Sequence, residues 1–91
     1  METWVNIIGY PAYEVSCRGR VRNVKGKILQ QRTGPDGALL VNLHYAKGIA
    51  YCRVANIVAT AFCDNPVGSM TVRHLDYNLL NCAACNLYFG N

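Results

Sequence analysis

The sequence predicts a small α+β domain in which antiparallel strands come first and two short helices follow. Up to residue 53, apolar and polar side chains alternate along several short runs, which is the period of half-buried strands. From Val54 the apolar side chains recur every three or four residues, which is the period of a helix packed on a sheet. Turn-forming residues separate these runs, so a small antiparallel sheet followed by a more helical half is expected.

The strands are expected in the first half of the chain. Within 38–45, Val41 and Leu43 fall on one side of the predicted strand, and their neighbours Asn42 and His44 fall on the other. Thr-Gly-Pro-Asp-Gly forms a turn before this strand, and Ala-Lys-Gly forms a turn after it. The remaining candidates are 13–16, 20–24 with a continuation at 27–30, and 49–53.

The helices are expected in the second half. The apolar stripe from Val54 to Phe62 predicts a helix, and Pro66 prevents its continuation. A short strand at 70–74 and a loop lead into a second short helix around 81–87, with Asn81 as its N-cap.

Composition limits the class of protein. Nine Lys and Arg against five Asp and Glu give a net charge of +4 on 91 residues, which favours an anionic partner. Hydrophobic residues make up 52%, too many for a disordered chain, and their runs are too short to span a bilayer. An odd count of five cysteines and an N-terminus without a secretory signal predict reduced thiols and a cytoplasmic location, with no membrane partner.

Arg18, Arg20 and Arg22 are the most informative charges. On one strand their spacing would put three guanidiniums on the same face with a pitch of about 6.6 Å, close to the spacing of phosphates along a nucleic-acid strand. Lys25 and Lys27 would extend the row after a turn. An acidic protein surface or a solvated strand face are the alternatives.

Two stretches of the first half carry a family resemblance. The chain reads W-V-N-I-I-G-Y at 4–10, Y-E-V-S at 13–16 and G-R-V-R at 19–22. This pattern resembles the small nuclease-associated module at the N-terminus of the HNH homing endonucleases of phages and mobile introns. The resemblance implies such a module over 1–48, within a single compact domain over 1–91.

The second half resembles the HNH core of the same family. It reads R-V-A-N-I-V-A-T-A-F at 53–62, V-R-H-L-D-Y-N-L-L-N at 72–81 and N-L at 86–87. The resemblance implies a ββα-metal-like core over 49–91. It also implies that His74 is the ancestral general base and that Asn86 is a metal ligand on the following helix.

The sequence departs from the family at the metal site. Arg73 stands where the family has Asn or Asp, and a guanidinium stays protonated and offers no lone pair to a cation. We therefore expect no cofactor, with Mg²⁺ or Mn²⁺ only if cleavage is retained. Tyr77 replaces a family glycine, and Tyr77 and Tyr88 are candidates for exposed contacts.

Cys82 and Cys85 form one C-x-x-C pair. Structural zinc takes four ligands, commonly from two such pairs, so two small buried or half-buried thiols are favoured over a zinc site.

Together these observations predict a degenerate and truncated HNH-endonuclease relative from a phage or mobile element. We expect it to bind nucleic acid or a nucleic-acid-processing complex of the host through Arg18, Arg20, Arg22, Lys25, Lys27 and Arg73, with cleavage lost. Two alternatives stay open: an inhibitor that binds a host nuclease or an RNA-guided defence complex, and a metal-dependent DNA-nicking endonuclease. The residues name neither the target nor the oligomeric state.

Overall fold

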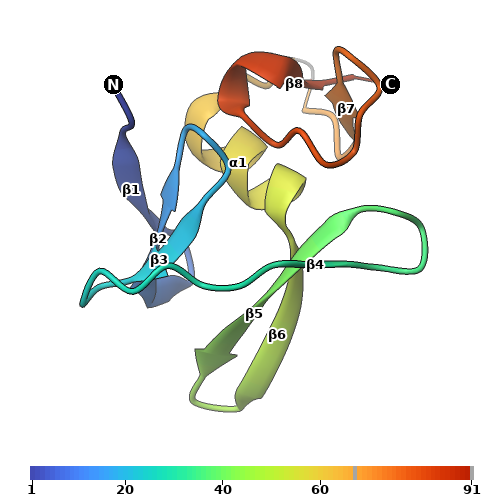
Figure 1. The fold of residues 1–91 in the computed structure, drawn as a ribbon. Coiled ribbons are helices and arrows are strands. Elements are labelled where there is room, and N and C mark those ends of the chain that lie inside the picture. Colours follow the sequence, from blue (N-terminus) through green and yellow to red (C-terminus); the bar gives the residue numbers. More distant parts are fainter. Residues whose placement is uncertain (67, 91) are drawn as a thin grey trace.

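The computed structural model describes residues 1–66 and 68–90 and, within them, contains one α-helix and eight strands (Figure 1). In chain order the elements are β1 (Trp4–Ile7), β2 (Tyr10–Ser16), β3 (Val21–Asn23), β4 (Arg32–Thr33), β5 (Leu39–Tyr45), β6 (Gly48–Arg53), α1 (Val54–Phe62), β7 (Val72–His74), a 3₁₀ turn η1 (Ala84–Asn86) and β8 (Leu87–Phe89).

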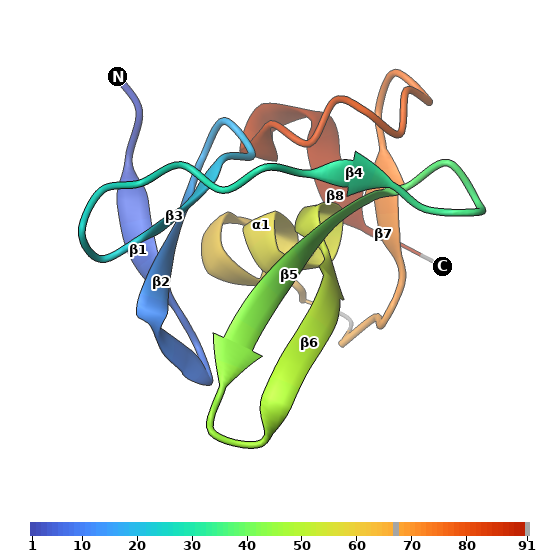
Figure 2. The same ribbon diagram turned by 60° about the horizontal axis from the view of Figure 1, so that its bottom comes forward.

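The strands form three small antiparallel sheets. Two have three strands each, β1-β2-β3 and β4-β5-β6, and the third is the β7–β8 pair. Figure 2 shows α1 behind β5, with β1–β3 on one side and the β7–β8 pair on the other. Since α1 contacts strands of all three sheets, it is the element that joins them.

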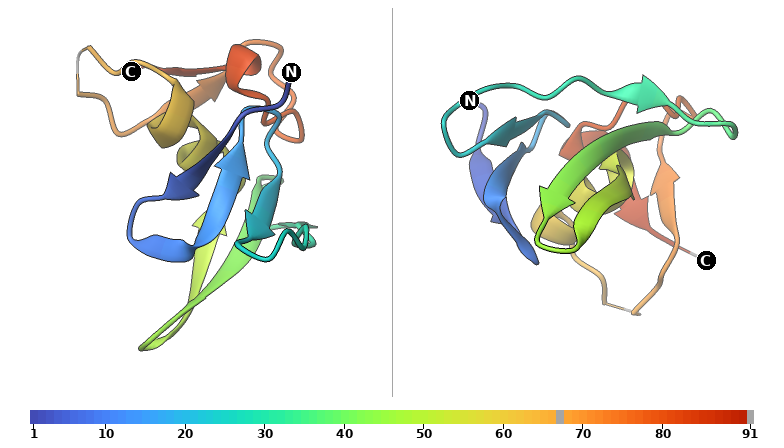
Figure 3. Two further views of the ribbon diagram at one scale, coloured as in Figure 1. Left: turned by 90° about the vertical axis from the view of Figure 1, so that its left-hand side faces the viewer. Right: turned by 90° about the horizontal axis from the view of Figure 1, so that it is seen from below.

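The core therefore forms around α1. The helix buries Val54, Val58 and Ala59, and these side chains meet Val15 of β2 and Leu43 of β5 in one continuous cluster. Figure 3 shows the three sheets around the helix from two further sides. Each small sheet covers only part of the apolar surface, so each depends on α1 for burial.

α1 is nine residues long. Within 1–66 and 68–90, no helix combines the length and the apolar character that a membrane crossing requires.

The segment before η1 packs against the turn that follows β2. The backbone N–H of Ala84 donates to the carbonyl of Cys17 at 2.7 Å. Gly19 lies so close to Cys82 that a Cβ on Gly19 would stand 2.8 Å from the Cys82 carbonyl oxygen. Gly19 also has φ of +86°, a conformation that side chains disfavour. This turn, which we call the docking turn (16–20), joins the two halves of the chain.

The expected α+β class and the helix at Val54–Phe62 are confirmed. The second helix around 81–87 is wrong: the chain there makes one 3₁₀ turn and then the strand β8. Asn81 does not cap a helix, because the N-cap position of η1 is Ala83. Tertiary contacts override local propensity here, since Leu87 pairs with His74 in the β7–β8 ladder.

The strand assignments differ at the edges. Residues 27–30 do not form a strand, and only the bridge between Arg22 and Ile28 remains of that continuation. β1, β4 and β8 were not predicted; they have two to four residues each, too few for a period to be recognised.

Replacing Gly19 by alanine is expected to lower the unfolding free energy by about 2–4 kcal/mol, because the new Cβ meets the Cys82 carbonyl and the positive φ is strained. Gly26→Ala is the matched control: its φ is +92°, but open space surrounds its Cβ position, so we expect about 1 kcal/mol. Urea unfolding measures both. Equal losses in the two variants would contradict the role of the docking turn.

Candidate functional site

His74 ends β7 and lies half-buried opposite Leu87 of β8. Its Nε2 atom is 4.0 Å from the Sγ atom of Cys82, which also lies 3.6 Å from the carbonyl oxygen of Leu79. Burial raises the pKa of the Cys82 thiol, so this sulfur is a neutral neighbour of the imidazole. Cys85, by contrast, is exposed, so the expectation of two buried or half-buried thiols holds for Cys82 only.

Three polar side chains tie the loop between β7 and β8 together. The amide nitrogen of Asn86 donates to the Asp76 carboxylate at 2.8 Å and to the Asn81 carbonyl at 2.9 Å. The Asn86 side-chain oxygen accepts from the backbone N–H of Asp76 at 3.1 Å. Asn81 donates to the other carboxylate oxygen of Asp76 at 2.9 Å. We call Asp76, Asn81 and Asn86 the loop clasp.

The clasp keeps Asp76 ionised. Hydrogen bonds from the Asn81 side chain, the Asn78 backbone and the Asn86 side chain lower the pKa of the Asp76 carboxyl. The ionised carboxylate therefore stabilises the loop by accepting hydrogen bonds from Asn78, Asn81 and Asn86.

These residues do not fit a divalent cation of the kind that the HNH resemblance implies. Asn86, the ligand that the resemblance implies, ends the 3₁₀ turn η1 and does not lie on an α-helix. It is 6% exposed, and both polar atoms of its side chain are engaged. Arg73, beside His74 on β7, brings a positive charge where a ligand is required. Among residues 1–66 and 68–90, no cluster of three or more His, Cys, Asp or Glu is arranged for a metal.

A shallow hollow of about 260 Å³ opens beside His74. Tyr77 stands at its edge with 90% of its surface exposed and φ of +59°, a left-handed conformation that costs a non-glycine residue about 1 kcal/mol or more. A tyrosine thus occupies a backbone conformation that favours glycine. The lining residues are Thr71, Val72, Arg73, His74, Tyr77, Leu79 and Tyr88.

The predicted single-strand arginine row is wrong in its geometry. The buried Ser16 hydroxyl accepts the backbone N–H groups of Arg18 and Arg20, so the chain turns at these residues and only Arg22 lies in β3. Arg20 pairs with Glu2, and the Nε atom of Arg22 donates to Glu14 at 2.8 Å.

Both paired guanidiniums also stack on Trp4. The central guanidinium carbons lie 5.6 Å (Arg20) and 4.0 Å (Arg22) from the centre of its ring. Hydrogen bonds from Arg20 and then Ser16 lower the pKa of Glu2 to about 2. Lys25 and Lys27 lie in the exposed turn after β3, where their backbone N–H groups donate to Asn23. Their contact with a partner stays a prediction.

A second charged surface was not predicted. On the outward side of the β4-β5-β6 sheet, the guanidinium of Arg32 lies 5.4 Å over the ring of Tyr51 and also donates to Asn42. Tyr51 is 66% exposed. The alternation along 38–45 and 49–53 contained this signal, because the side chains opposite the buried set must face outward. We call Arg32, Asn42 and Tyr51 the sheet face.

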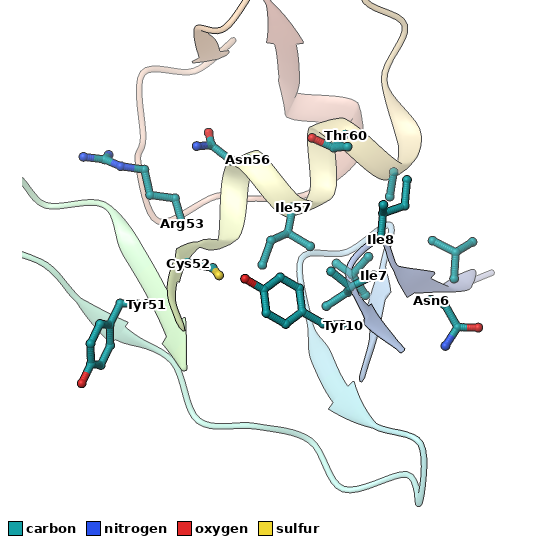
Figure 4. A pocket seen from close by; sticks show the side chains of 13 residues that line it. Asn6, Ile7, Ile8, Tyr10, Tyr51, Cys52, Arg53, Asn56, Ile57 and Thr60 are labelled. Atoms are coloured by element: carbon teal, nitrogen blue, oxygen red, sulfur yellow. The ribbon is translucent and has the colours of Figure 1, made fainter. Parts of the chain in front are cut away.

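A groove of about 640 Å³ lies between β1, β6 and α1 (Figure 4). Figure 4 shows Tyr10, Cys52 and Ile57 meeting at its centre and Ile8 at its rim. Burial raises the pKa of both Tyr10 and Cys52. None of the described residues that line this groove is a carboxylate or a histidine.

Two comparisons with known proteins find a match to this chain. Residues 2–44 match the NUMOD4 motif. A solved structure, described as "DNA binding and cleavage by the HNH homing endonuclease I-HmuI", matches 98% of this chain with a TM-score of 0.89 and 31% sequence identity. The match covers 52% of that chain, so this chain spans about half its length. A comparison with curated proteins finds no match.

Asn86→Asp distinguishes a clasp residue from a metal ligand. A second carboxylate facing Asp76 is expected to lower the unfolding free energy by about 2 kcal/mol or more. The control Asn56→Asp, at an exposed position in the first turn of α1, is expected to be neutral or slightly stabilising. An Asn86→Asp protein that keeps its stability and is further stabilised by Mn²⁺ in thermal unfolding would contradict the clasp.

The Glu2–Arg20 pair predicts an acid-sensitive contribution to stability. The pKa of Glu2 is lowered from 4.5 to about 2 in the folded protein, so its contribution is fully present above pH 4.5 and is lost as pH falls toward 2. The free energy of unfolding in urea can be measured from about pH 6 to about pH 2, a range that includes this window. It should fall less on acidification for Glu2→Gln than for the wild type. Parallel curves would refute this role of the pair.

Proposed function

The chain belongs to the HNH homing endonuclease family, and from this premise we propose that it binds nucleic acid without cleaving it. The solved relative is described as binding and cleaving DNA, and this chain corresponds to about half of that protein. Binding and cleavage are therefore argued separately below.

Loss of cleavage is supported by one observation, the presence of Arg73 immediately before His74 on β7. A metal ion in such centres stabilises the charge that develops on the phosphoryl group and the leaving group. The guanidinium of Arg73 repels a dication and has no lone pair to offer it. The Asn86 amide does not compensate, because it is held by Asp76 and Asn81.

The nicking alternative would need another oxygen ligand near His74, and Asp76 or Asn78 would have to supply it. The side-chain oxygen of Asn78 already accepts the backbone N–H of Leu80. The Asp76 carboxylate already accepts hydrogen bonds from Asn78, Asn81 and Asn86. Turning it toward a cation would break the loop clasp, so we do not favour this alternative. The inhibitor alternative stays a prediction, tested by whether a protein partner is captured from nuclease-treated host lysate.

Nucleic-acid binding is supported by the sheet face and by the net charge of +4. Arg32 is held in place by the Tyr51 ring and the Asn42 amide, so its guanidinium is oriented before a ligand arrives. The long strands β5 and β6 form an antiparallel pair. A two-stranded β-ribbon fits the major groove of duplex DNA, where arginine and asparagine bond base edges and phosphates. Arg18, Lys25 and Lys27 add exposed positive charge at other turns.

Plasmid nicking tests the loss of cleavage. With Mg²⁺ or Mn²⁺ present, the wild type is expected to nick supercoiled plasmid no faster than His74→Ala, since the site lacks the ligands for a cation. Gel separation of nicked and supercoiled forms gives the rates. Nicking by the wild type that disappears in His74→Ala would overturn the proposal.

Salt dependence tests the binding surface. The affinity for duplex DNA is expected to fall linearly on a log–log salt plot, with a slope of about −0.9 per phosphate contact. Arg32→Gln should weaken binding and reduce this slope by about 1 if Arg32 contacts a phosphate. Arg20→Gln is the matched control, because Arg20 is already paired with Glu2. Binding that ignores salt, or a larger effect in Arg20→Gln, would reject the sheet face as the binding surface.

A further inference from the structure

Tyr77 combines two properties that folding alone does not explain. Its backbone has φ of +59°, where glycine is favoured, and its side chain is 90% exposed. An exposed ring gains little from packing in the folded chain, so the tyrosine side chain itself contributes little to offset the strained backbone. Strained residues of this kind concentrate where proteins contact ligands.

The surroundings of Tyr77 indicate which ligand. The hollow is lined by two phenol rings, Tyr77 and Tyr88, together with Arg73, His74 and the apolar side chain of Leu79. Tyr88 lies directly opposite Arg73 in the β7–β8 ladder, so the guanidinium and this ring share the outward face of the pair. Proteins that bind single-stranded nucleic acid commonly stack the unpaired bases on aromatic rings and bind the phosphate backbone with neighbouring cationic side chains.

The shape of the hollow favours an unpaired nucleotide over a base pair. A volume of about 260 Å³ is of the order of one nucleotide, and a base within a duplex keeps both faces stacked on its neighbours. A ring at the edge of the hollow can contact a base face only when that base has left the stack. The sheet face, in contrast, presents the exposed ring of Tyr51 and the guanidinium of Arg32 on the outward side of a sheet, and we assign the duplex to it.

We propose that the hollow over the β7–β8 pair binds one unpaired nucleotide. Tyr77 and Tyr88 contact the base, and Arg73 contacts the phosphate. This inference rests on the proposed nucleic-acid binding and deepens it, because it assigns duplex and single-stranded segments to different surfaces of the molecule. The site that has lost its cation ligands thus holds the nucleic-acid backbone through a permanent positive charge.

Three variants at one position separate the ring from the backbone strain. Tyr77→Phe keeps the ring, Tyr77→Ala removes it and keeps a side chain at positive φ, and Tyr77→Gly removes both. With fluorescein-labelled oligothymidylate as the probe, anisotropy should show about tenfold weaker binding for the Ala and Gly variants and unchanged binding for Phe. Thermal unfolding should show Tyr77→Gly to be more stable than the wild type.

Tyr51→Ala is the matched control, since Tyr51 is an exposed tyrosine on the sheet face. It should weaken binding of a duplex of the same length and leave oligothymidylate binding unchanged. Duplex binding without oligothymidylate binding, or oligothymidylate binding that Tyr77→Ala does not weaken, would overturn the inference and leave the proposed function standing. Failure to bind either probe would overturn both. Capture of a protein that depends on the Tyr77 ring, without oligothymidylate binding, would assign this surface to a protein partner instead.

Discussion

The hydrogen bonds of the Asn86 side chain constrain everything that the loop between β7 and β8 presents to solvent. Because one buried amide joins Asp76 to the carbonyl of Asn81, the twelve residues from 75 to 86 hold a fixed path although they contain only one short 3₁₀ turn. This path places Tyr77 at the edge of the hollow. It also occupies the group that the HNH resemblance implied as a metal ligand. The same hydrogen bonds therefore shape the candidate site and engage both polar atoms of the Asn86 side chain.

The two halves of the chain are folded as one unit because neither can cover its own apolar surface. The β1–β3 sheet, the β4–β6 sheet and the β7–β8 pair all pack on a single nine-residue helix. The docking turn then fixes the β7–β8 loop through Cys17 and Gly19. Backbone contacts thereby connect the N-terminal half to the segment that contains Cys82, the neighbour of His74.

The local sequence pattern was sufficient to predict the elements that are long enough to show a regular spacing of apolar residues. The helix over Val54–Phe62 and the strand β5 follow from the spacing of their apolar side chains. The predictions of a second helix and of an arginine row were wrong because residues far away in the sequence determine the structure there. Leu87 pairs with His74 of β7, and Arg20 pairs with Glu2, which is 18 positions away in the chain. The sheet face was readable in principle, since its residues alternate with the buried ones, but the pairing of Arg32 with Tyr51 required the sheet register.

Trp4 is the single tryptophan of the chain, and it lies against the guanidiniums of Arg20 and Arg22 in the β1–β3 sheet, away from the lining of the hollow. Its ultraviolet emission is therefore an intrinsic optical reporter of whether the N-terminal sheet is intact. The tyrosines that line the hollow, Tyr77 and Tyr88, are two of six in the chain, so Trp4 is the side chain whose emission is assigned to one place without any added dye.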